Sequence, residues 1–143
     1  MRFFMSRFEE VTLALLRVVA GLLFWQHGAQ KLLGMFGGVD GQGATPPLMS
    51  QFGLAGVLEF VGGILIALGL FTRPVAFILA GEMAVAYFQV HAPNGFWPIV
   101  NKGELAVLYC FLFLYLSARG AGRYSLDAAL FRRTPADRPV ATS

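Results

Sequence analysis

Four apolar stretches, each close to 20 residues long, take up most of this 143-residue chain. They run over residues 11–33, 52–71, 74–90 and 103–118. An α-helix needs about 20 apolar residues to cross a hydrocarbon core about 30 Å thick. The pattern therefore predicts an all-α integral membrane protein, a single transmembrane domain over residues 1–143 in which the first stretch is a retained helix rather than a cleaved signal peptide.

The composition excludes the common soluble classes. Hydrophobic residues make up 57% of the chain and charged residues only 13%, which is roughly half of the usual charged fraction of soluble domains. A chain this short buries only about 68% of its unfolded surface, which leaves too little interior for its 14 phenylalanines. Its single cysteine, Cys110, excludes a disulfide scaffold. We therefore expect the lipid bilayer to be the solvent for most of the protein.

Basic residues in the flanks of the stretches predict the orientation. Lys and Arg concentrate on the cytoplasmic side of membrane proteins, so both termini are expected in the cytoplasm. Residues 119–143 are interpreted as a cytoplasmic tail with a short interfacial helix that begins at Ser125. The net charge of +3 follows from this asymmetry, and we expect no nucleic-acid partner. The basic residues on the expected inner side are Arg2, Arg7, Arg73, Arg119, Arg123, Arg132, Arg133 and Arg138.

Residues typical of helix ends predict three connections. Gly34 to Ser50 is rich in Gly and contains Pro46-Pro47, which predicts a loop without regular structure. Thr72-Arg73 is interpreted as a very tight turn. Asn101 with Glu104 three residues later predicts an N-cap and an acidic first turn for the last stretch.

Polar side chains inside the stretches should face one another, because charges in lipid are costly. Helical phase places them on one face of each predicted helix, as an antiparallel four-helix bundle requires. Counting depth along the helices predicts that Arg17 pairs with Glu82. These faces hold Arg17, Phe24, His27 and Lys31 in the first helix, Glu59 in the second, Glu82 and Gln89 in the third, and Glu104, Leu108, Phe111 and Tyr115 in the fourth.

Structural roles for these residues stay open beside functional ones. Arg17 can snorkel to the inner headgroups, and Glu104 can do no more than cap its helix. Glu59 and Glu82 lie deeper, where buried carboxylates usually mark a pathway or a site. Haem is disfavoured, because axial ligation needs well-placed histidines and His91 is on the opposite face from Glu82. No metal-ligand spacing is present, and we expect no metal site.

The order of these residues resembles the DoxX family of small membrane proteins. The resemblance covers about four fifths of the chain and rests on the segments LLRVVAGLLFWQHGAQKLLGMFGG, LEFVGGILIALGLFTRPVA, GEMAVAYFQVHAPNGFWP, NKGELAVLYCFLFLYL and GAGRYSLD. It implies a multi-pass, four-helix protein of the bacterial cytoplasmic (inner) membrane. It also implies a link to quinone-dependent oxidoreductases, in which such a chain serves as a membrane subunit beside a redox partner protein.

A quinone site is the first functional hypothesis. His27 and Lys31 would donate hydrogen bonds to the quinone, and Glu104 would exchange its proton. Phe24 and Tyr115 would line the apolar entrance, and the remaining contacts would come from Arg17, Glu59, Glu82 and Gln89. The chain has no evident redox centre, so whether it is itself an enzyme or a non-catalytic subunit stays open.

Two other hypotheses compete with the quinone site. The protein could be a membrane adaptor whose basic tail recruits oxidative-stress or thiol enzymes. It could also be a small transporter or proton pathway through Glu104, Glu59, Glu82 and Arg17, although no internal repeats are evident. The electron donor stays open, as does the oligomeric state, with a homo-oligomer among the options.

Overall fold

The structure is a computed structural model of the chain, and it describes the backbone of residues 2–131 and the side chains of residues 5–131. The described residues form six α-helices, namely α1 (Arg2–Leu33), α2 (Gln51–Leu68), α3 (Thr72–Ala86), α4 (Pro98–Asn101), α5 (Glu104–Arg119) and α6 (Leu126–Phe131). Within the described residues there is no β-strand, only one isolated bridge between Gly38 and Ala44. The predicted all-α class is therefore confirmed.

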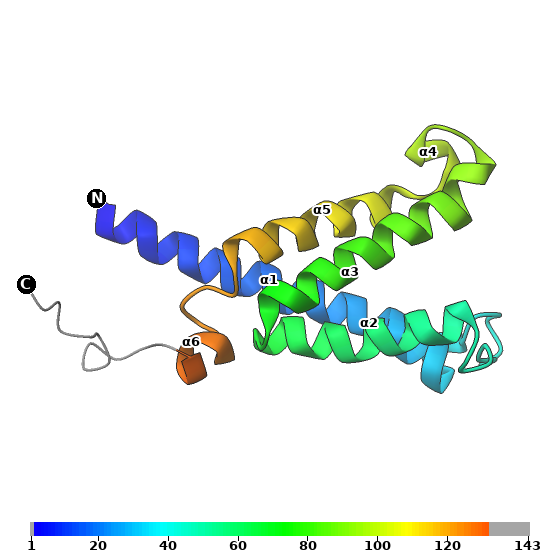
Figure 1. Cartoon of the computed structure of the whole chain (residues 1–143), viewed down its shortest axis with the longest axis horizontal. Helices are drawn as coiled ribbons and strands as arrows, with labels where there is room; N and C mark the ends of the chain where they lie inside the picture. The colour runs from blue at the N-terminus through cyan, green and yellow to red at the C-terminus, as the bar shows by residue number, and fades with distance from the viewer. Residues whose placement is uncertain (1, 132–143) are drawn as a thin grey trace, which may run out of the picture.

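Four long helices set the shape of the molecule (Figure 1). α1 packs along α2, α3 packs along α5, and α2 and α3 also contact each other. α2 and α3 meet at the end of the molecule where α6 lies, and α4 lies at the opposite end of α3 (Figure 1). α2 and the helical stretch Thr72–Asn94 are each long and apolar enough to cross a membrane.

Glycines allow α1 and α2 to approach closely. A Cβ atom added to Gly28 would overlap the backbone of Phe60 and Glu59, and one added to Gly63 would lie 2.6 Å from the backbone nitrogen of Trp25. Small residues at such contacts are typical of helices that pack in lipid. The close approach brings the end of α1 against α2 at the level of Glu59.

Replacing Gly28 with alanine should therefore separate α1 from α2 and destabilise the protein by about 1–3 kcal/mol, the usual cost of overpacking. Gly81 is the matched control, since it lies in α3 with no atom within 4 Å of an added Cβ. Gly81→Ala should be neutral or stabilising, by up to about 1 kcal/mol, because alanine favours helix. Thermal unfolding in detergent measures both, and equal melting temperatures would contradict the close packing.

An aromatic cluster forms the core between α1 and α5. The ring of Phe24 lies 5.2 Å from that of Tyr109 and 4.9 Å from that of Phe113. The face of α5 that carries Tyr109 and Phe113 is therefore the buried one, and it differs from the predicted face. The predicted inward stripe is wrong, because its residues Leu108, Phe111 and Tyr115 are exposed while the buried residues of α5 are Ala106, Tyr109, Phe113 and Leu116.

The connection between α2 and α3 differs from its prediction. α2 ends at Leu68, and Gly69 takes the left-handed conformation with φ 69°. Thr72 and Arg73 are already helical, so the turn occupies Gly69–Phe71 instead. The carboxylate of Asp127 accepts hydrogen bonds from the backbone N–H groups of Phe71, at 2.7 Å, and Thr72, at 2.9 Å. A side chain from the distant α6 region thus caps α3, which a local reading of the turn could not predict.

The connection before α5 also differs from its prediction. Asn101 ends α4, and its side-chain oxygen accepts a hydrogen bond from Gly103 N at 2.8 Å. Gly103 occupies the N-cap position of α5 without a side-chain cap, so the predicted Asn101 cap is wrong. The amide nitrogen of Asn101 instead donates to Gly95 O, which fixes the loop around α4.

Two further expectations concern loops and the tail. The Gly34–Ser50 connection is an irregular loop, as predicted, and its short turn over Met35–Gly37 includes Phe36 in the left-handed conformation with φ 54°. Ser125 starts α6 as predicted, with its hydroxyl oxygen accepting a hydrogen bond from Ala128 N at 3.1 Å. The basic residues Arg132, Arg133 and Arg138, counted for the tail, lie outside the described residues.

Candidate functional site

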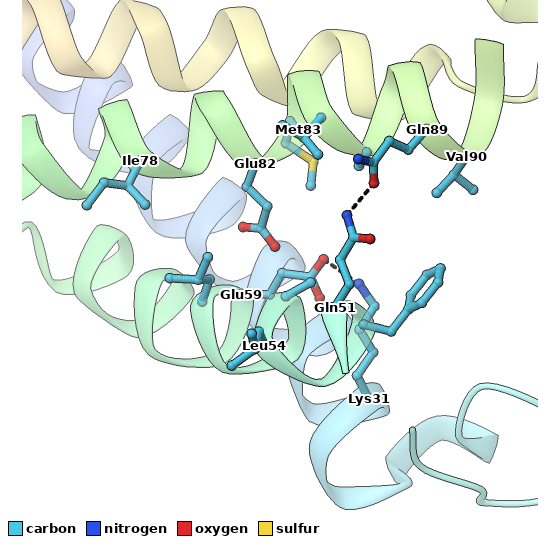
Figure 2. A pocket seen from close by; sticks show the side chains of 14 residues that line it. Lys31, Gln51, Leu54, Glu59, Ile78, Glu82, Met83, Gln89 and Val90 are labelled. Atoms are coloured by element: carbon cyan, nitrogen blue, oxygen red, sulfur yellow. Dashed lines mark hydrogen bonds and ion pairs between the residues drawn. The ribbon is translucent and has the colours of Figure 1, made fainter. Parts of the chain in front are cut away.

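A cavity of about 490 Å³ lies between α2 and α3. Its walls are mostly apolar, and its polar side chains come from three helices, with Lys31 reaching in from α1 (Figure 2). The lining residues are Lys31, Gln51, Phe52, Leu54, Ala55, Leu58, Glu59, Ile78, Glu82, Met83, Val85, Ala86, Gln89 and Val90.

An ion pair joins α1 to α2 at the cavity. Lys31 Nζ lies 2.6 Å from Glu59 Oε1, and the Glu59 side chain is only 4% exposed. Gly56, one turn before Glu59, leaves room for the stem of Lys31, because a Cβ atom there would lie 2.9 Å from Lys31 Cβ. The second oxygen of Glu59, Oε2, is buried and has no hydrogen-bond partner. The pair is therefore held in place but not fully satisfied.

Glu82 extends from α3 toward Glu59 across the cavity (Figure 2). Both of its carboxylate oxygens are buried without a hydrogen-bond partner. Its electrostatic neighbours are Glu59 and Lys31. Buried polar groups are normally hydrogen-bonded, so Glu82 is the cavity side chain whose hydrogen-bonding capacity the described residues leave unused.

Two amides bridge α2 and α3 along the same cavity. The side chain of Gln51, in the first turn of α2, donates a hydrogen bond to Gln89 Oε1 beyond the end of α3 (Figure 2). Both amides are exposed. They are neutral groups that can donate and accept hydrogen bonds beside the charged groups of Lys31, Glu59 and Glu82.

The structure brings four of the predicted site residues together, namely Lys31, Glu59, Glu82 and Gln89. His27 is half-buried and interacts electrostatically with Glu59, although it does not line the cavity. The other four do not meet there. Phe24 is buried in the aromatic core, Glu104 and Tyr115 are exposed on α5, and Arg17 binds elsewhere.

The predicted pairing of Arg17 with Glu82 is wrong. The guanidinium of Arg17 donates hydrogen bonds to Ile66 O at 2.8 Å, Ala67 O at 2.6 Å and Tyr124 O at 2.6 Å. The last carbonyls of a helix have no partner within it, so they compete strongly for a buried cation. Arg17 therefore fixes the end of α2 rather than taking part in the cavity.

The sequence prediction missed Gln51. This residue lies just outside the predicted second stretch, although it is eight residues before Glu59. At about 100° per residue, that spacing places both side chains within an 80° arc of one helix. The spacing was therefore enough to place Gln51 near Glu59 on the helix. It was missed because the predicted second stretch began at residue 52.

Comparison with known proteins identifies the family. Residues 12–92 match the DoxX family model. A Haemophilus influenzae protein named only as uncharacterized is 46% identical over 90% of this chain and 98% of its own length. The "Putative oxidoreductase CatD" of Bacillus subtilis is 28% identical over 90% of this chain and 93% of its own length.

Another relative carries a location in its name. The inner membrane protein YqjF of Escherichia coli is 28% identical over 90% of this chain and 99% of its own length. No solved structure matches the chain. Because the family model covers more than half of the chain, the protein belongs to the DoxX family and is a membrane protein.

Proposed function

We propose that this DoxX-family membrane protein binds the head group of a lipid-borne quinone in the cavity between α2 and α3. In this proposal the four long helices form an antiparallel bundle that crosses the inner membrane as a single domain, with both termini in the cytoplasm. The quinone exchanges electrons with a soluble redox partner. The names of two relatives, "Putative oxidoreductase CatD" and "Inner membrane protein YqjF", agree with this setting.

The observation that carries the proposal is the chemistry of the cavity wall. Apolar side chains such as Leu54, Leu58 and Ile78 form most of it, and an ammonium, two carboxyl groups and two amides lie among them. Ligand sites typically combine mostly apolar walls with a few polar groups that fix orientation. A quinone has this division in one molecule, since its tail and ring are apolar and its two carbonyl oxygens accept hydrogen bonds.

Access from lipid supports the same ligand class. Leu54, Leu58, Ile78 and Val85 line the cavity and are also exposed on the surface of α2 and α3. In a membrane these exposed apolar side chains would face acyl chains. A ligand dissolved in the bilayer could therefore enter between α2 and α3 without crossing water.

The donors differ from those of the sequence hypothesis. Lys31 lines the cavity and can donate a hydrogen bond to a quinone carbonyl, whereas Glu104 does not line it. Gln51 and Gln89 add amide donors, of which the sequence hypothesis included Gln89 but not Gln51. We therefore place the quinone contacts on Lys31, Gln51, Glu82 and Gln89, with Glu59 holding Lys31 in position.

Direct binding tests this function. The purified protein, reconstituted in nanodiscs, is titrated with a short-chain ubiquinone and a short-chain menaquinone, and bound quinone is quantified after separation. Ala55→Trp should fill the cavity and weaken binding by about tenfold or more, a loss of about 1.4 kcal/mol. Val61→Trp is the matched control, because Val61 is half-exposed on the same helix and does not line the cavity.

Three results would overturn the proposal. One is an absence of saturable binding of either quinone to the wild-type protein. Another is equal binding by Ala55→Trp and the wild type when both proteins insert into the membrane normally. Loss of binding in both tryptophan variants would also count against the cavity, because the effect would then not depend on the cavity wall.

A further inference from the structure

We propose that Glu82 holds the exchangeable proton of the cavity and transfers it to the bound quinone. This inference rests on the proposed function for its ligand. The cavity has more acidic than basic side chains. Two carboxyl groups, Glu59 and Glu82, face one ammonium, Lys31.

The geometry distinguishes the two carboxyl groups. Glu59 has a cation 2.6 Å from Oε1 and an electrostatic interaction with His27 as well. Among the described residues neither oxygen of Glu82 has a hydrogen-bond partner, although both are buried. An unpaired charge in an apolar site is strongly disfavoured, so such a group gives up its charge by taking a proton. The neutral combination is therefore an ionised Lys31–Glu59 pair beside a protonated Glu82.

Among the side chains that the structure describes, the helices around Glu82 provide no second cation that faces it. α1 contributes Lys31 and, close to Glu59, His27. α2 contributes Glu59, which disfavours a second negative charge nearby. α5 packs on α3, and among its buried residues the titratable one is Tyr109, which is neutral. Of the two carboxyl groups at the cavity, Glu82 is therefore the one that keeps its proton.

A protonated carboxyl group can both hydrogen-bond a quinone carbonyl and give it a proton. Its O–H donates a hydrogen bond to the carbonyl oxygen, whereas a carboxylate could only accept. Reduction of a quinone to a quinol takes two electrons, which the soluble redox partner supplies, and two protons. Glu82 gives one proton, so that its O–H bond breaks and a quinol O–H bond forms, and a water molecule gives the other and becomes hydroxide. Glu82 then recovers a proton from water.

Infrared difference spectroscopy tests this role without the partner protein. The protein with bound short-chain ubiquinone is reduced and reoxidised at an electrode, which supplies the electrons. We expect the C=O stretch of a neutral carboxylic acid to change on reduction and to be absent in Glu82→Gln. The band should persist in Glu104→Gln, the matched control on α5, which does not line the cavity.

Binding and turnover then separate the two proposals. Glu82→Gln keeps the shape and a hydrogen-bond donor, so quinone affinity should change by less than about threefold, while quinone reduction slows by about 100-fold, as for loss of a general acid. Quinone bands without a carboxylic acid band that depends on Glu82 would overturn the inference and leave the proposed function intact. Absence of quinone bands would overturn the proposed function, whether or not Glu82 is protonated.

A second variant guards against misfolding of the first. Glu82→Asp keeps a carboxyl group with a shorter stem. It should retain the carboxylic acid band, at a shifted position, and reduce quinone faster than Glu82→Gln. Equal rates in the two variants would contradict proton transfer by this side chain.

Discussion

Replacing Lys31 with methionine should destabilise the protein by about 3–5 kcal/mol, the usual cost of removing one partner of a buried ion pair. Glu59 would then be a carboxyl group without a cation in a side chain that is only 4% exposed, and both keeping its charge and taking a proton would cost free energy. Methionine keeps the length and the apolar stem of lysine, so the packing of α1 on α2 near Gly56 should be preserved. Unfolding in nanodiscs, followed by circular dichroism during heating, measures the loss.

The double variant Lys31→Met with Glu59→Leu shows whether charge is the cause. Replacing both partners of a buried pair with apolar residues is often neutral or stabilising. We therefore expect the double variant to unfold close to the wild-type temperature. If Lys31→Met alone matched the wild type within about 1 kcal/mol, the pair would be as weak as an exposed one. If the double variant were as unstable as the single one, lost packing would be the cause.

The sequence predicted the cavity residues better than it predicted their partners. Lys31, Glu59, Glu82 and Gln89 were expected to face inward because charged and amide groups are costly in lipid, and all four line the cavity. Their partners depend on how far each helix is shifted and tilted against the next. Depth counted along separate helices contains neither quantity, which is why it paired Glu82 with Arg17.

The face of α5 shows another limit. Between Glu104 and Arg119 this helix has no charged residue, so polarity does not indicate which side is buried. Aromatic residues occur on several sides, and the stripe with Phe111 and Tyr115 fitted helical spacing as well as the stripe with Tyr109 and Phe113. The contact of Phe24 with Tyr109 and Phe113 decides between them. That contact is between distant segments, and no local pattern contains it.

Arg17 is the site of the second large effect. Replacing it with methionine should cost at least about 3 kcal/mol, because three hydrogen bonds from a buried charged group are lost and each is worth about 1.5–3 kcal/mol. The residue is 2% exposed, and its guanidinium joins the last turn of α2, through Ile66 and Ala67, to Tyr124 before α6. Without it Ala67 O loses the donor that Arg17 provides, Ile66 O keeps only the backbone N–H of Gly69, and the segment that carries Asp127 loses one anchor. The melting temperature and the rate of amide hydrogen exchange at Phe71 and Thr72 measure the two consequences.

Arg73 provides the matched control for Arg17. It also reaches three carbonyls, donating hydrogen bonds to Ser117 O at 3.1 Å, Ala118 O at 2.5 Å and Arg119 O at 3.3 Å at the end of α5, but its side chain is exposed. An exposed cation at a helix C-terminus contributes only about 0.3–1 kcal/mol. Arg73→Met should therefore lower the melting temperature far less than Arg17→Met, and Arg17→Lys should lie between the two because an ammonium lacks the planar fork that reaches three carbonyls. Equal losses from Arg17→Met and Arg73→Met would mean that the burial of Arg17 adds nothing, and that this end of the molecule depends on the helix dipole alone.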